Sequence, residues 1–362
     1  MRAALAAVLR ERDPDAPVTV LGAGSDDLEA GRAYLAALVD GGWAVPTWPV
    51  EYGGRGASPD ESALIARELA RFEQPDLYPY LVGLGVVAPT LLTEATPEQR
   101  QRWLPRIKSG EQIWCQLFSE PGAGSDLANV STRAERDGDV WRVTGQKVWT
   151  SRGAYADIGF LVARSDPSVP KHAGITTFAL DMHAVGVDVR PLVQMNGDSH
   201  FSEVFLDGVL VDDVDRIGDV GSGWAVTRAA LANERGAIGA VGTGLGAPAE
   251  RLLELGCRDD RVMRVYVESE VNRLTMRRAR DLAKAGTPGP EGSGAKLRGA
   301  ELLKHTANTA LELLGPEGVV GEGEWQTLFL TAPSISIRGG TDEIQRNIIG
   351  ERVLGLPRDP RP

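Results

Sequence analysis

Cysteine and histidine are scarce in this chain. Its 362 residues include only two cysteines, Cys115 and Cys257, and four histidines, at positions 172, 183, 200 and 305. Two distant cysteines cannot build a disulfide framework or a cysteine-rich metal site. The histidines show no i,i+4 pairing and no acidic companion, so neither a histidine-based metal site nor a catalytic triad is indicated. We expect a protein of a reducing compartment without a bound metal.

Long apolar runs and an excess of basic charge are also missing. No window approaches the roughly 20 apolar residues of a membrane span. The first residues, MRAALAAVLRERDPDAP, contain a short apolar stretch that charged residues follow at once, without the cleavage signature of a signal peptide. The 39 lysines and arginines are outnumbered by 50 aspartates and glutamates, and the net charge of -11 opposes binding to nucleic acid. A cytoplasmic protein with no membrane span is expected.

Helical periodicity is abundant on both sides of a β-rich middle region. Helix starts are indicated at Ser58 and Thr96, each followed by proline, and a Pro/Gly-rich loop is predicted at 285–296. The middle region consists of short β-rich runs between turns, without a dinucleotide or phosphate-loop fingerprint. The predicted class is α+β. The predicted domains are an N-terminal α-helical domain at 1–112, a central antiparallel β-domain at 113–215 and a C-terminal helical bundle at 216–362.

Two motifs in the middle region carry the most chemical information. They are WCQLFSEPGAGSD at 114–126 and GQKVWTSRGA at 145–154. The glycines of PGAGS allow the backbone to approach a ligand, and small hydroxyls in such a turn can bind phosphate or the edge of a ring. Taken singly, the first motif is typical of a surface loop, and Trp149 is typical of an aromatic residue packed in a sheet. The combination of the two motifs favours a ligand site.

Together with three further motifs, these two resemble the acyl-CoA dehydrogenase family over essentially the whole chain. The further motifs are WPVEYGG at 48–54, GSGW at 221–224 and RGGTDEIQRNIIGERVLG at 338–355, in the family's order. The resemblance implies an acyl-CoA dehydrogenase-like fold, with an N-terminal α-helical domain, a central antiparallel β-domain and a C-terminal four-helix bundle. It also implies a tetrameric, FAD-dependent oxidoreductase of lipid catabolism that desaturates the α,β bond of an acyl-CoA thioester. Electron-transfer flavoprotein is the implied acceptor.

The resemblance assigns binding roles to residues at matching positions. The residues implied to bind FAD are Phe118, Ser119, Trp149, Thr150, Ser151, Gly315, Thr341, Asp342 and Glu343. Among them, Gly315 belongs to a turn that would meet the FAD of a neighbouring subunit. The residues implied to bind the acyl-CoA are Ser125, Arg235 and Gly340.

The family's usual catalytic base is absent from this sequence. Most members place a glutamate just before Gly-Thr in the C-terminal motif, where this chain has Gly339. A minority, typified by isovaleryl-CoA dehydrogenase, carry the base in a Glu-Arg pair shortly after the Gly-x-Gly-aromatic turn, and Glu234 and Arg235 match that pair. Because a thioester α-hydrogen is a weak acid, its removal needs a carboxylate in a dry pocket. We predict that Glu234 is the base; the alternative is a solvated charge on a helix.

The helix around Glu234 is rich in glycine. Each interior glycine costs about 1 kcal/mol of helix propensity relative to alanine. Close helix packing is one reason for such a composition, and room for an acyl chain beside the base is another. The glycines concerned are Gly236, Gly239, Gly242, Gly244 and Gly246.

A second departure concerns cofactor sharing between subunits. Many relatives carry an Arg-x-x-Phe-Gly segment that reaches a neighbour's FAD, whereas this chain reads CRDDRVMRVYVESEV at 257–271, where Arg258 or Arg261 could substitute. The expected assembly is a homo-oligomer or a mixed oligomer with a second acyl-CoA dehydrogenase-like subunit. The alternative functions are a flavin-sharing or non-catalytic subunit of such a tetramer, and a flavin oxidase or monooxygenase on the same fold. The missing side chain at Gly339 suggests room for a branched or bulky acyl group, such as a steroid side chain or a polyketide-like thioester.

Overall fold

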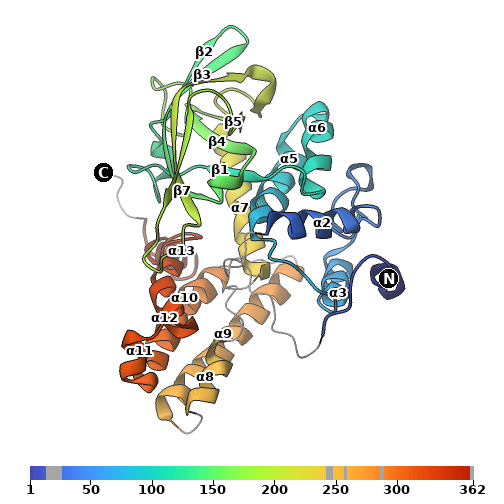
Figure 1. The fold of residues 1–362 in the computed structure, drawn as a ribbon. Helices are drawn as coiled ribbons and strands as arrows, with labels where there is room; N and C mark the ends of the chain where they lie inside the picture. Colours follow the sequence, from blue (N-terminus) through green and yellow to red (C-terminus); the bar gives the residue numbers. More distant parts are fainter. Residues whose placement is uncertain (14–26, 242–247, 257–258, 286–288, 290, 359–362) are drawn as a thin grey trace. The chain divides into compact units, whose positions relative to one another are not determined.

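The computed structural model describes residues 1–13, 27–241, 248–256, 259–285, 289 and 291–358, and it contains two compact units (Figure 1). The larger unit comprises Met1–Gln194 and Asp198–Gly244, and the smaller unit comprises Met195–Gly197 and Leu245–Pro362. The larger unit thus combines N-terminal helices, the β-sheet and the long helix that carries Glu234. The three domain boundaries given above stay a prediction.

Local sequence signals define two helices near the start of the larger unit. Ser58 caps α3 (Pro59–Leu69) and Thr96 caps α6 (Pro97–Lys108), each through a capping box with proline after the cap. Both predicted helix starts are confirmed. The other elements of this part are α1 (Arg2–Ala6), α2 (Leu28–Val39), η1 (Val50–Tyr52), α4 (Tyr78–Val82), η2 (Gly83–Val87) and α5 (Ala88–Glu94).

The middle region forms an eight-stranded sheet with the order β6-β7-β3-β2-β4-β5-β8, and β1 pairs with β4 off this path. Most neighbours are antiparallel, as predicted, but β1 and β2 both pair with β4 in parallel. The strands are β1 (Trp114–Leu117), β2 (Arg133–Asp137), β3 (Val140–Ser151), β4 (Ile158–Arg164), β5 (Ile175–Asp181), β6 (Val187–Leu192), β7 (Phe201–Asp212) and β8 (Arg216–Ile217).

Helix α7 (Gly223–Val241) belongs to the larger unit and packs against α5, η2 and β5. Its buried residues Val226 and Ala230 lie in the same hydrophobic cluster as Phe118 and Phe160 of the sheet region. Burial of these apolar side chains supplies the main stabilisation for the contact. The core of the larger unit therefore fixes α7 relative to the first of the two motifs.

The smaller unit is helical and is organised around α10 (Glu291–Leu314). This helix packs against α8 (Pro248–Gly256), α9 (Asp260–Lys284), α11 (Pro316–Val320), α12 (Glu324–Ile335) and α13 (Asp342–Arg352). The predicted loop at 285–296 is wrong in its second half, because α10 begins at Glu291. A Cβ at Gly292 or Gly294 would have open space, so packing does not require glycine at either position, whereas Ala295 and Ala300 of the same helix are buried.

Among the described residues, no helix is both long and apolar enough to span a membrane.

Candidate active site

The two motifs of the middle region lie side by side. Ser119 directly follows Phe118 after β1, and its carbonyl oxygen accepts a hydrogen bond from the amide of Val148 at 2.9 Å. The Phe118 ring is buried and meets Phe160 edge-on at 5.4 Å between ring centroids. The backbone of the first motif is therefore fixed to the strand that carries Trp149.

A buried ion pair joins the same two motifs. Lys147 is fully buried, and its ammonium donates to Glu120 at 2.7 Å, to the Phe118 carbonyl at 3.0 Å and to the Val162 carbonyl at 2.8 Å. Burial lowers the pKa of Lys147 to about 8, against the opposing charge of Glu120. A buried charge needs such partners, because its desolvation is otherwise costly.

Glu120 is supported from its other side. Its carboxylate also accepts hydrogen bonds from Ser131 and from the Thr132 amide. Burial alone raises the pKa of Glu120, but the charge and hydrogen bonds of its partners outweigh it and lower the pKa to about 2. Both members of the pair are therefore charged at neutral pH.

The backbone is strained at both ends of the segment 149–152, which contains the predicted flavin-flanking residues of the second motif. Among the described residues, the two non-glycine positions with positive φ are Trp149, at 60°, and Arg152, at 54°. A left-handed conformation costs a non-glycine residue about 1–2 kcal/mol, and such strain gathers at functional sites. The sheet register is irregular here as well, with a bulge between Lys147 and Thr150. The backbone thus departs from regular strand geometry where the ligand is expected.

The side chain of Trp149 is largely exposed to solvent. The residue is 61% exposed, although it lies in a strand, and its ring meets Phe201 edge-on at 6.0 Å. Ser151 is half-buried next to it, whereas Thr150 is fully buried and its hydroxyl has no hydrogen-bond partner among the described residues. An exposed indole beside small hydroxyls fits a planar ring system with polar edges. The alternative, in which Trp149 is an ordinary packed sheet residue, is not supported.

Glu234 lies on the face of α7 that meets the sheet. It is half-buried, and its Oε2 accepts a hydrogen bond of 3.1 Å from Nε2 of Gln116 on β1. The preceding residue, Asn233, donates to the hydroxyl of Thr90 on α5 at 3.1 Å. Glu234 is therefore not a fully solvated charge, but its role as the base stays a prediction. Arg235 follows it in α7; of the helix glycines, Gly242, Gly244 and Gly246 lie outside the described residues.

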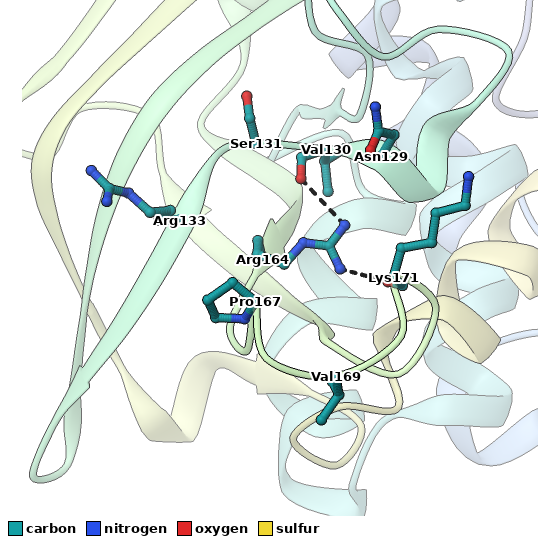
Figure 2. Close-up of a pocket in the computed structure, with 8 residues that line it drawn as sticks. All are labelled: Asn129, Val130, Ser131, Arg133, Arg164, Pro167, Val169 and Lys171. Carbon is teal, nitrogen blue, oxygen red and sulfur yellow. Dashed lines mark hydrogen bonds between the residues drawn. The ribbon is translucent and has the colours of Figure 1, made fainter. Parts of the chain in front are cut away.

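A basic pocket of about 490 Å³ lies beside the end of the first motif. Ser125 is exposed, and its neighbour Asp126 pairs with Lys171 at 2.8 Å. Arg164 donates to the carbonyls of Ala128, Val130 and Lys171 and so ties the pocket wall together. Figure 2 shows the lining residues, which are Asn129, Val130, Ser131, Arg133, Arg164, Pro167, Val169 and Lys171.

The remaining predicted residues belong to the smaller unit. Thr341 caps α13 by accepting from the Ile344 amide, Asp342 is buried, and Glu343 is exposed. Although burial raises the pKa of Asp342, hydrogen bonds from Ser336 and Lys296 lower it below its ordinary value. Lys296 lies 3.0 Å from the carboxylate.

Glycines shape the backbone at two predicted positions in this unit and at Gly339, where the family's usual base is missing. Gly315 precedes α11 with φ of 60°, and Gly339 and Gly340 have φ of 68° and 88°. A glutamate at 339, the family's usual base, would have to adopt a left-handed conformation that side chains disfavour. The local backbone is consistent with glycine there and with a base elsewhere.

We expect Gly340→Ala to destabilise the protein by about 1–2 kcal/mol, because it forces a side chain into a left-handed conformation. Its Cβ would also lie 2.7 Å from Nε2 of Gln345, whose amide donates to the carbonyls of Gly339 and Gly340. Urea denaturation followed by circular dichroism measures the change. Gly350→Ala is the matched control, because Gly350 is helical and its Cβ would make only an ordinary contact at 3.5 Å. Equal stability of the two variants would contradict this account of the turn.

Comparison with known proteins covers most of the chain. Three domains of the acyl-CoA dehydrogenase family match it: the N-terminal domain at residues 22–111, the middle domain at 115–209 and the C-terminal domain at 249–354. Acyl-CoA dehydrogenase IpdE1 of Mycobacterium tuberculosis is 39% identical over 347 residues, which are 92% of this chain and 90% of that protein. The chain belongs to the acyl-CoA dehydrogenase family, whose members are flavoproteins and oxidoreductases acting on CH-CH groups.

Other relatives differ in length or assembly. Acyl-CoA dehydrogenase FadE34 of Mycobacterium tuberculosis is 46% identical over 332 residues; they cover 89% of this chain, which spans only about half (46%) of that relative. Among solved structures, the Tcur3481-Tcur3483 steroid ACAD matches with a TM-score of 0.80 and 28% identity, covering 91% of this chain and 90% of that one. The ChsE4-ChsE5 complex from Mycobacterium tuberculosis matches with a TM-score of 0.76 and 32% identity, with the same coverage. The family and fold expected from the sequence motifs are confirmed.

Sequence reasoning missed three polar residues of the site, namely Gln116, Glu120 and Lys147. All three lie inside the motifs that were singled out, and a lysine within a β-rich run was a usable signal, because a buried lysine requires an acidic partner. The partner itself was not predictable, because the pairing depends on how β1 and β3 come together in the sheet.

Proposed function

We propose that this chain is an FAD-dependent acyl-CoA dehydrogenase that desaturates the α,β bond of an acyl-CoA thioester, with Glu234 as the base. One observation carries the proposal: the Glu234 carboxylate is hydrogen-bonded to Gln116, on the strand that runs directly into Phe118 and Ser119. A carboxylate and the two flavin-contacting segments predicted in the middle region thus lie within one compact unit. Removal of a thioester α-proton needs such a carboxylate close to the electron acceptor.

The residues at hand fit FAD. The exposed Trp149 indole offers a flat apolar surface, and Ser119 and Ser151 offer polar groups for the edge of a ring. When bound, FAD would supply the acceptor for the hydride of the β-carbon. The Lys147–Glu120 pair would keep the two segments in register, since it connects the backbone around Phe118 to the strand of Trp149.

Glu234 would take the proton of the α-carbon. Its half-buried position limits contact with water, and a partly desolvated carboxylate is a stronger base than a fully hydrated one. Arg235, next in α7, is proposed to help position the thioester or its CoA, and Gly340 is proposed to contact the substrate.

The basic pocket is proposed to bind the phosphate groups of CoA. Its Lys171 pairs with Asp126, the neighbour of Ser125, which is the residue proposed to contact CoA; Arg133 and Arg164 contribute further positive charge to it. Cationic side chains are the usual protein partners of phosphate.

Removal of Arg133 should weaken the binding of CoA thioesters specifically. Arg133 is exposed, so we expect Arg133→Ala to fold normally and to raise KM for an acyl-CoA roughly fivefold, as for the loss of a solvent-exposed ion pair. KM for the same acyl group on pantetheine, which lacks the nucleotide phosphates, should not change. Arg142→Ala, another exposed arginine of the sheet, is the control. An equal rise for both thioesters would contradict a role of Arg133 in phosphate binding.

The proposed substrate is an acyl-CoA with a branched or bulky acyl group. Gly339 leaves space where most family members carry a side chain, and one structural neighbour is described as a steroid ACAD. The proposed electron acceptor is an electron-transfer flavoprotein. A mixed oligomer with a second acyl-CoA dehydrogenase-like chain is proposed because two of the solved neighbours combine two differently named proteins.

A panel of acyl-CoAs with an artificial electron acceptor tests the proposed activity. Mass spectrometry should find a product lighter by two hydrogens, with the highest kcat/KM for a branched or polycyclic acyl group. A clear preference for straight short-chain substrates would overturn the proposed acyl specificity. If dioxygen alone sustained turnover at the full rate, the proposed acceptor would be wrong.

A further inference from the structure

Gln116 is a polar residue in an otherwise apolar strand. In β1 its neighbours Trp114, Cys115 and Leu117 are all buried, and Gln116 itself is half-buried. A primary amide in such a place is stable only if its donors and acceptor find partners. The partner observed for the amide nitrogen is the carboxylate of Glu234, 3.1 Å away and 118 positions later in the sequence.

We propose that Gln116 is the positioning residue of the catalytic base: its amide fixes the Glu234 carboxylate relative to the Phe118–Ser119 segment. This inference rests on the proposed function. Two rigid elements meet at the contact, because β1 pairs with β4 over four residues and α7 is anchored in the same hydrophobic cluster as Phe118. A base supported from a strand and a helix keeps the narrow range of orientations that proton transfer requires.

The chemistry of the amide suits this role in both protonation states of the base. An ionised carboxylate only accepts hydrogen bonds, so the amide nitrogen faces it, and this contact favours the ionised form that can take a proton. Once the carboxyl group carries the proton, the same side chain can present its oxygen by rotation and accept from it. A lysine at this position would favour the anion more strongly and would weaken the base, whereas a leucine would remove this hydrogen bond.

The second attachment of α7 strengthens the case for positioning. Asn233 donates to Thr90, whose hydroxyl in turn donates to the Val86 carbonyl at 2.7 Å. Consecutive residues of α7 are thus tied to α5 and to β1. Because the buried Val226 and Ala230 together with the Asn233 contact hold the helix, loss of the Gln116 amide should leave α7 in place and change only the carboxylate.

The test compares Gln116→Met with the wild-type holoenzyme. Methionine keeps the length of the side chain but removes the donor. Anaerobic flavin reduction by an acyl-CoA should slow by about 10- to 100-fold at neutral pH, as for the loss of a hydrogen bond to a charged group. The acid limb of the pH profile should move to higher pH, while FAD content and thermal midpoint stay within error. Gln101→Met is the matched control, because Gln101 is exposed on α6.

Gln116→Glu separates charge from shape, because it is isosteric and sets a like charge beside the base. It should move the acid limb further toward high pH than Gln116→Met does. The inference is overturned if both variants keep the wild-type rate and profile while Glu234→Gln abolishes reduction. If Glu234→Gln is itself reduced normally, the base assignment fails instead. If both substitutions cause loss of FAD or poor folding, Gln116 has a merely structural role, and this outcome also overturns the inference.

Discussion

Glu234→Gln should bind FAD and acyl-CoA and yet be reduced roughly 100- to 10,000-fold more slowly than the wild-type protein, the range for removal of a general base. Glutamine has the same shape but cannot take the α-proton. Retained binding is expected because Glu234 accepts a hydrogen bond from Gln116 of β1, which lies outside the Phe118–Ser119 segment proposed to contact the flavin. Anaerobic stopped-flow absorbance of the flavin measures the rate.

The matched control for this substitution is Glu135→Gln. Glu135 is exposed on β2, so the same chemical change there should leave the reduction rate within twofold of wild type, as for surface positions in general. A Glu234→Gln rate close to that of Glu135→Gln would show that the proton goes to another group. Gly339→Glu would not supply that group, since the backbone at 339 has φ of 68° and disfavours a side chain.

Lys147→Met should lower the free energy of unfolding by about 3–5 kcal/mol, because it leaves the Glu120 carboxylate buried without its counter-charge. Lys147 is fully buried and Glu120 is 5% exposed, so water cannot replace the lost ammonium. The double variant Lys147→Met/Glu120→Gln should recover part of the loss, since it removes both charges. Guanidinium denaturation of the holoenzyme measures the three values.

A surface ion pair provides the contrast. The Lys171–Asp126 pair has nearly the same length, 2.8 Å against 2.7 Å for Lys147–Glu120, but its side chains are 45% and 57% exposed. Lys171→Met should therefore cost less than about 1 kcal/mol. A loss of similar size for Lys147→Met and Lys171→Met would contradict the importance of the buried pair.

The pKa of Glu120 adds a pH dependence. In the folded protein its pKa is lowered to about 2 from an ordinary value of 4.5, by its partners and against the effect of burial. A lowered pKa of an acid means that the stabilisation is fully present above pH 4.5 and is lost as pH falls toward 2. The stability advantage of wild type over Glu120→Gln should shrink over this interval. An advantage that stays constant down to pH 2 would contradict the ion pair.

Local signals in the sequence predicted the helix caps and the order of helical and β-rich regions. Ser58 and Thr96 cap their helices through residues three positions away, so the information is contiguous. The predicted loop at 285–296 is wrong in its second half, because its glycine content indicated a loop whereas Ala295, which follows two glycines, is buried in a helix of the smaller unit. Local propensity gives way to tertiary packing at such positions.

The site was predictable only in part, and for a physical reason. The resemblance marked Trp149 and Glu234, but neither the positive φ of Trp149 nor the Gln116 contact follows from periodicity or spacing. The contact of Gln116 joins residues 118 positions apart, and that of Lys147 with Glu120 joins residues 27 apart. Such pairs are set by how β1, β3 and α7 pack, which a single sequence does not specify.

Exchange of the substrate α-hydrogen tests the central claim most directly. In a 3-thia-acyl-CoA, sulfur replaces the β-carbon, so no hydride can leave and only proton abstraction remains observable. In deuterated buffer, we expect the wild-type protein to introduce deuterium at the α-carbon, detected by mass spectrometry, and Glu234→Gln to introduce essentially none while still binding the analogue. Deuterium exchange by Glu234→Gln at the wild-type rate would contradict the assignment of Glu234 as the base.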